Sequence, residues 1–104
     1  MRAYWLSFVD PERPKGERFL GVSIVQVSDE EVEAQREEAA GWAEPERGME
    51  IAAAVAKAWD TGCNPGGEVQ GFRIDQAPKF EELKDKIVFH QLLSEADLVE
   101  RGLL

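Results

Sequence analysis

Residues 2–27 read RAYWLSFVDPERPKGERFLGVSIVQV and contain two apolar segments separated by a charged, proline-containing loop. Tyr4, Leu6 and Phe8 fall on one side of residues 2–9, and this period of two predicts a strand. Residues 19–27 have the same period and predict a second strand. The loop of residues 10–18 is too long for a two-residue hairpin turn, but consecutive strands usually lie side by side, so we expect the two to pair as antiparallel neighbours.

Two helices are predicted after these strands. Ser28 begins the pattern S-D-E-E, in which the serine hydroxyl and the Glu31 carboxylate form a capping box for a helix from Asp29 to about Ala43. Its apolar stripe is thin, so we expect it to pack weakly as an excursion from the core. The second helix is predicted from about Glu46 or Met49 to Thr61, with Gly62 as its C-terminal cap. A clear apolar stripe predicts that this helix packs on the sheet; it comprises Ile51, Ala54, Val55, Ala58 and Trp59.

The rest of the chain predicts shorter elements. Residues 64–67, N-P-G-G, indicate a turn before a third strand from Glu68 to Ile74. A short helix is expected after Pro78, and a last one from Glu95 to Arg101 with Ser94 at its N-cap. Residues 87–90 fit either a short strand or a helix, and the pattern does not separate the two.

These elements predict one α+β domain over residues 1–104, with a three-stranded antiparallel sheet in the order 2-1-3. The main helix is expected on one sheet face, with the acidic helix and short C-terminal helices around it. That face is predicted to carry Tyr4, Leu6, Phe8, Leu20, Val22 and Ile24. On the opposite face we expect Trp5 near Gly21 and Ser23. The C-terminal segment covers that face, or Trp5 belongs to an exposed apolar patch that binds a partner.

The charge is strongly acidic, with 21 acidic and 12 basic residues and a net charge of −9. Residues 29–50 hold nine of the acids against two arginines, a net charge of −7. An acidic domain repels phosphate, so direct nucleic-acid binding is not expected. The acidic stretch, 29–48, is either a solvated surface or an interaction surface for a basic protein. No apolar run approaches the ~18 residues of a membrane span, so no membrane partner is expected.

Little in the sequence indicates catalysis. Cys63 is the only cysteine and His90 the only histidine, so a nucleophile–base pair would need the fold to bring them together. One of each excludes a structural zinc site within the chain, and we expect no metal or cofactor. The glycine-rich loop 62–67 lies between a helix and a strand, the reverse of the order in phosphate-binding loops. A single thiol and no secretory signal predict a reducing, cytoplasmic location.

Several segments resemble small proteins of unknown function from bacteria and their phages. They are the opening YWLSFVD and FLGV, TGCNPGGEVQGFRI at 61–74, and LLSEADL at 92–98. The resemblance implies a compact cytoplasmic domain and carries no catalytic residue onto this chain. It also implies that the acidic stretch 29–48, which it does not touch, is the variable part.

The leading functional expectation is a non-catalytic protein-binding domain that acts through its acidic helix or through an exposed face or edge of the sheet. The candidate binding residues are Glu30, Glu33, Glu37, Glu44 and Trp5. The alternative is an acidic inhibitor that imitates nucleic acid, because nine acids along a continuous helix of about 33 Å would approach the phosphate spacing of one DNA strand. An enzyme using Cys63 and His90 ranks third. Self-association stays open.

Overall fold

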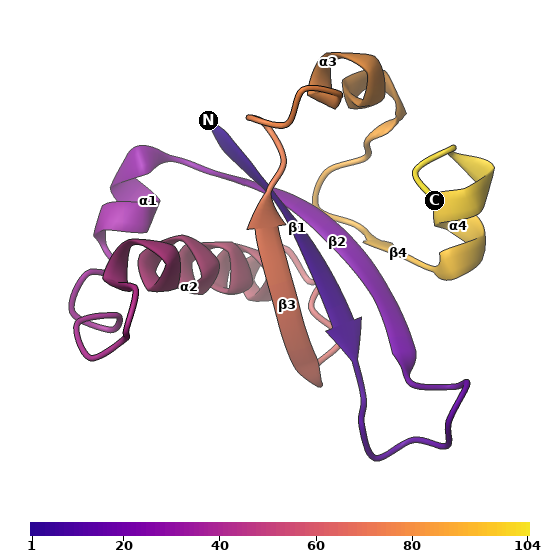
Figure 1. The fold of residues 1–104 in the computed structure, drawn as a ribbon, viewed down its shortest axis with the longest axis horizontal. Coiled ribbons are helices and arrows are strands. Elements are labelled where there is room, and N and C mark those ends of the chain that lie inside the picture. Colours follow the sequence, from indigo (N-terminus) through magenta and orange to yellow (C-terminus); the bar gives the residue numbers. More distant parts are fainter.

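The computed structural model describes the whole chain, residues 1–104, and shows an α+β fold built on one antiparallel sheet (Figure 1). The strands are β1 (Arg2–Val9), β2 (Phe19–Val27), β3 (Glu68–Arg73) and β4 (Leu92–Leu93). The helices are α1 (Asp29–Glu33), α2 (Pro45–Asp60), α3 (Phe80–Leu83) and α4 (Glu95–Glu100), and α3 continues into a 3-10 turn at Lys84–Lys86. No helix is both long and apolar enough to cross a membrane.

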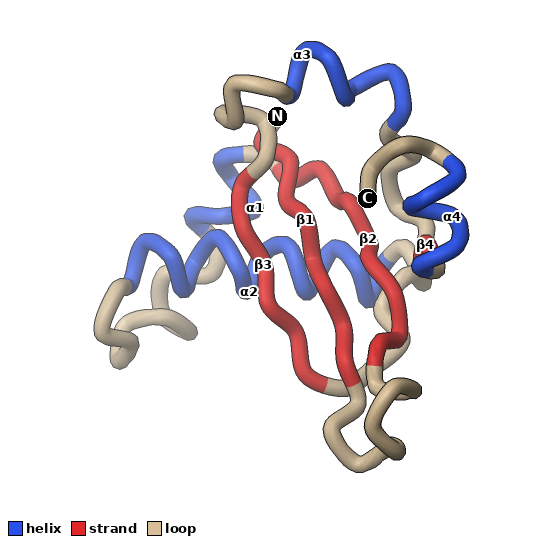
Figure 2. The backbone as a smooth tube through the Cα atoms, turned by 45° about the vertical axis from the view of Figure 1, so that its right-hand side comes forward, coloured by secondary structure: helices blue, strands red, loops and turns tan.

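The sheet has four strands in the order β3-β1-β2-β4, so the prediction of three strands was wrong (Figure 2). The predicted neighbours are present, because β1 pairs antiparallel with both β2 and β3. The missed strand, β4, has two residues and pairs with Val22 and Ser23. Two residues are too few to show a period in the sequence. Residues 87–90 form neither a helix nor a named strand; Phe89 makes one isolated bridge to Ile24.

The long helix α2 lies across one face of the sheet, as predicted (Figures 1 and 2). The core beneath it contains Tyr4, Leu6, Phe8, Val25, Val27, Met49, Ala53, Ala54 and Ala58. Val22 and Ile24 were expected on this face, but they lie on the opposite one. The reason is a register shift beside Phe8 and Val9, with Gly21 at a φ of +133°, so that Leu20 and Val25 both face α2.

Two of the helix predictions need correction. The first helix ends at Glu33 rather than near Ala43, and residues 34–44 form turns and bends with only Ala39 buried. The apolar stripe there is too thin to hold a longer helix against the core. In α2, Trp59 points away from the sheet with an exposed fraction of 61%, whereas the smaller Ala54 and Ala58 are fully buried. Small side chains let α2 approach the sheet closely.

The C-terminal segment covers the other face of the sheet, as one of the two alternatives predicted. Its cluster comprises Ala3, Val22, Ile24, Ile74, Leu93 and Leu98, and Trp5, Phe80, Ile87, Phe89 and Leu103 pack against it. Trp5 lies beside Ile24 on β2 and Phe72 on β3, not beside Gly21 and Ser23. The capping boxes at Ser28 with Glu31 and at Ser94 with Asp97 are both formed.

Candidate functional site

The outer edge of β3 is open. In an antiparallel ladder, alternate residues point their N–H and C=O groups toward one neighbour and the rest point them away. The Ile74 N–H donates to the Ala3 carbonyl at 2.9 Å, so the even-numbered residues of β3 face β1. The backbone groups of Val69, Gly71 and Arg73 therefore face outward, where no strand follows. This edge presents a row of donors and acceptors along the six residues of β3.

A groove of about 570 Å³ runs along this edge. It is lined by Ser7, Trp42, Arg47, Ile51, Val69, Gln70, Gly71 and Phe72. Ile51 belongs to the α2 side of the sheet, whereas Gln70 and Phe72 face the opposite side with Ser7 and Trp5. The groove therefore wraps around the edge strand and is open to both sheet faces.

Two aromatic side chains stand in this groove, and each has an exposed fraction of 52%: Trp42 and Phe72. Trp42 comes from the bend before α2 and lies against Gly48, where an added Cβ would be 2.8 Å from the indole. Phe72 stacks on Trp5, with the ring centroids 6.1 Å apart. Half-exposed aromatic rings are enriched where proteins bind other proteins.

Arg47 lies across the strand edge. Its Nη2 donates to the outward carbonyl of Gly71 at 3.2 Å, which is the one side-chain hydrogen bond to the outward row of β3. Gly71 lets α2 come this close, because a Cβ at that position would lie 2.7 Å from Leu6 Cδ2 and 3.1 Å from Ile51 Cδ1. The missing side chain at Gly71 therefore leaves the space that the Leu6 and Ile51 side chains occupy beside the strand.

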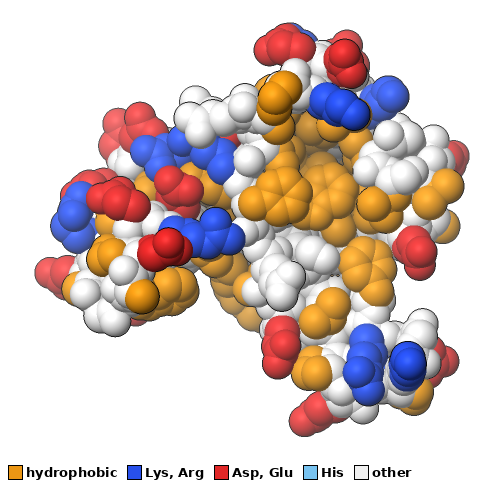
Figure 3. All heavy atoms as spheres, viewed as in Figure 1, with side chains coloured by type: hydrophobic (Ala, Val, Ile, Leu, Met, Phe, Trp, Pro, Cys, Tyr) orange, Lys and Arg blue, Asp and Glu red, His pale blue; other side chains and the backbone are white.

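Trp5 lies on the opposite face from α2, within an apolar surface. A cavity of about 330 Å³ beside it is lined only by hydrophobic side chains, among them Phe72, Ile74, Phe80 and Leu103. Figure 3 shows apolar side chains gathered over the centre of this sheet face, below α3. Phe72 lines both this cavity and the groove, so the two surfaces are continuous.

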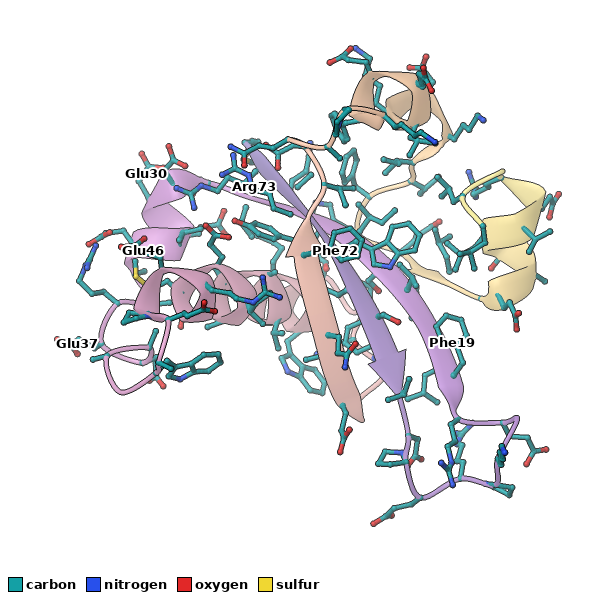
Figure 4. All side chains as sticks on the ribbon, in the orientation of Figure 1. Phe19, Glu30, Glu37, Glu46, Phe72 and Arg73 are labelled. Atoms are coloured by element: carbon teal, nitrogen blue, oxygen red, sulfur yellow. The ribbon has the colours of Figure 1, made fainter.

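The acidic candidates do not form one site with Trp5. Glu30 and Glu33 border a shallow depression between α1 and α2, together with Glu46. Glu37 lies on the turns that follow α1, and Glu44 borders a cavity beside Trp42 and Arg47. Figure 4 shows Glu30, Glu37 and Glu46 on the same side of β3 as its open edge. The acids are not arranged along one continuous helix, so the regular charge spacing that favoured a nucleic-acid mimic is absent.

Four acids of residues 29–50 are matched by cations. Arg2 pairs with Asp29 and Glu50, Lys57 pairs with Glu31, and Arg36 pairs with Glu33. The hydrogen bond from Lys57 holds the pKa of Glu31 below its usual range, and Arg36 does the same for Glu33. The five remaining acids have no cation partner: Glu30, Glu37, Glu38, Glu44 and Glu46. Negative charge is therefore left over on this side of the molecule.

Cys63 and His90 have separate neighbours, and no hydrogen bond joins them. The buried Cys63 Sγ lies 3.3 Å from Thr61 Oγ1. His90 Nδ1 is buried without a hydrogen-bond partner, and burial, followed by the nearby Lys57, lowers the pKa of this imidazole. No group of three or more His, Cys, Asp or Glu side chains is placed to hold a metal ion.

None of the groove residues Trp42, Arg47, Ile51, Gly71 and Phe72 was predicted from the sequence as a site residue. The only signal for them was Gly71, which interrupts a strand pattern and often marks a close backbone approach. Comparisons with protein families, with curated proteins and with solved structures find no match to this chain.

Proposed function

We propose that this protein is a non-catalytic, cytoplasmic protein-binding domain that takes up an extended segment of its partner along the outer edge of β3. The added segment forms a fifth strand next to β3, a recognised mode of peptide binding in which backbone hydrogen bonds supply affinity and pockets for alternate side chains supply specificity.

The open edge of β3 is the observation that carries this proposal. Proteins usually protect edge strands by shortness, proline, bulges or covering elements. The opposite edge of this sheet is such a case, since β4 has two residues and continues directly into α4. In contrast, β3 has six residues, contains no proline and is crossed only by the Arg47 side chain.

The groove also suits the side chains of an added strand. Successive side chains of a strand point to opposite faces of the sheet. On one face they would meet Trp42 and Ile51, and on the other they would meet Phe72 beside the apolar cavity. Both faces of the edge thus offer apolar contacts to the alternating side chains of an extended peptide.

Hydrogen–deuterium exchange with selected peptides tests the proposal. Peptides are selected on the intact protein from a displayed random library, and amide exchange is measured with and without each peptide. We expect slower exchange at Val69, Gly71 and Arg73, and little change at Gln70 and Phe72, whose amides already face β1. The proposal fails if no peptide is selected, or if the bound peptides leave the outward amides unprotected.

A proline variant with a matched control sharpens the test. Val69→Pro removes an outward N–H and leaves the inward bonds to β1 in place, so peptide binding should be lost. Lys15→Pro is the control, because Lys15 follows Pro14 in a turn closed by the Glu17 N–H, a position where proline is favoured. Should Val69→Pro not fold, N-methylation at each peptide position in turn gives the same information with the natural protein. N-methylation at every second peptide position should abolish binding, because only alternate N–H groups of an added strand face β3. A scan without this alternation contradicts strand addition.

A further inference from the structure

We infer that the segment bound along β3 is basic, with lysine or arginine residues flanking a short apolar stretch. This inference rests on the proposed strand addition and names the chemistry of its occupant. The apolar stretch would lie over the groove, and the flanking cations would lie against the unpaired carboxylates of residues 37–46.

The unpaired negative charge lies on the same side of the sheet as the open edge of β3. The turns and bends of residues 34–44 and the start of α2 lie beyond the open edge of β3 in both views of the backbone (Figures 1 and 2). Glu44 borders a cavity that shares Trp42, Arg47 and Ile51 with the groove, so its carboxylate is next to the binding edge. Glu46 follows in the first turn of α2.

The cations of this region do not cancel that charge. Arg2 and Arg36 are already held by carboxylates, and Arg73 is held by Asp75 through two hydrogen bonds of 2.8 and 2.9 Å. Arg47 is the one cation in the groove, and Glu44 stands beside it. Glu68, exposed and without a cation partner, adds a further negative charge at the start of β3. A basic segment would therefore meet net negative charge at the groove and around it.

The aromatic side chains favour the same occupant. Trp42 and Phe72 are half-exposed at the groove, and a lysine or arginine placed over the face of an aromatic ring is attracted by its quadrupole. The same rings accept aliphatic side chains. An acidic segment would gain neither interaction and would be repelled by the surrounding carboxylates.

Three peptide sub-libraries test the inference. Their central six positions are random, and their two flanking residues on each side are all Lys, all Gln or all Glu. Binding is measured with the intact protein, together with amide exchange at Val69 and Gly71. We expect the Lys-flanked peptides to bind about tenfold or more tightly than the Gln-flanked ones at low salt, and this advantage should shrink as salt screens the charges.

A pair of charge-matched variants locates the effect. Glu44→Gln with Glu46→Gln should weaken binding of a Lys-flanked peptide by about 3–10-fold. The control, Glu95→Gln with Glu100→Gln, makes the same change in net charge on α4, beyond the opposite edge of the sheet. This control should change the affinity for the Lys-flanked peptide less than about twofold.

The outcomes separate the two proposals. If Gln-flanked peptides bind as tightly as Lys-flanked ones and still protect the β3 amides, the partner is not basic but strand addition stands. If both variant pairs weaken binding equally, the charge acts only through the whole molecule, and the placement of the cations near residues 37–46 is wrong. If no sub-library protects the β3 amides, strand addition itself fails, and the inference fails with it.

Discussion

Two charged residues, Arg47 and Asp75, have different roles at strand β3 because they have different hydrogen-bond partners. Arg47 of α2 covers the Gly71 carbonyl, and a charged side chain placed at the edge of a sheet discourages chance pairing with other chains. Binding of a partner strand would displace this single hydrogen bond of 3.2 Å and free the guanidinium. Asp75 acts differently: burial raises its pKa, but hydrogen bonds from Arg73 and from the Ala3 N–H outweigh burial and hold the pKa below its usual range. That carboxylate ties β1 to the end of β3.

His90 makes the stability of the protein depend on pH. Because burial lowers its pKa below the usual value of about 6.5, the unfolded chain binds the proton more readily than the folded one. Stability should therefore fall as the pH drops through 6.5, and the fall should level off once the folded form also protonates. His90→Asn should remove this pH-dependent loss of stability, and asparagine tolerates the φ of +62° at this position. Chemical denaturation of both proteins from pH 8 to pH 5 measures the difference, and parallel stability curves would contradict the assignment.

At the scale of elements, the contact between α2 and the sheet forms the groove. The helix buries Met49, Ala53, Ala54 and Ala58, three of them small, and so lies close to the strands. The bulky Trp59, which belongs to the predicted apolar stripe, is instead exposed to solvent. Because Ile51 of α2 packs beside Leu6, only a residue without a side chain, Gly71, fits between them. The same packing brings Arg47 within hydrogen-bond distance of the edge of β3.

Gly71→Ala tests this close approach. The added Cβ would lie 2.7 Å from Leu6 Cδ2 and 3.1 Å from Ile51 Cδ1, so these two packed side chains must shift, and we expect a loss of about 1–3 kcal/mol in the free energy of unfolding. Gly41→Ala is the control, since nothing lies within 4 Å of its added Cβ. Urea denaturation compares the two variants with the natural protein. Equal midpoints for both would mean that α2 does not pack closely on β3.

At the scale of the whole molecule, charge is distributed unevenly. The acids near α1 and the start of α2 are only partly matched by arginine and lysine, and the net charge of the chain is −9. Charge of one sign on one side of a protein steers partners of the opposite sign toward that side and raises the association rate. The open edge of β3 lies on the same side (Figure 4).

A triple charge reversal tests this steering. Glu30→Lys, Glu37→Lys and Glu44→Lys together move the net charge from −9 to −3 and break none of the ion pairs. Because all three side chains are exposed, we expect little change in the thermal midpoint. The association rate of a Lys-flanked peptide should fall about tenfold or more, as stopped-flow kinetics would show. The same reversal at Glu82, Glu95 and Glu100 is the control; an equal fall there would mean that only total charge matters.

Elements that depend on neighbouring residues could be predicted from the amino-acid sequence. These elements are the first two strands, the starts of α1 and α4, and the end of α2. Their signals act over a few neighbouring residues, and the predicted positions were correct: alternation in residues 2–9 and 19–27, capping boxes at Ser28 and Ser94, and the glycine after α2. The pairing in three dimensions selects which face of β2 meets α2, because both faces of that strand carry large apolar side chains and only the register of the ladder chooses between them. Tertiary structure also decided the exposure of Trp59 and the assembly of the groove. Phe72 is distant in sequence from Trp42 and Arg47, and they meet only because α2 crosses the sheet at the open edge of β3.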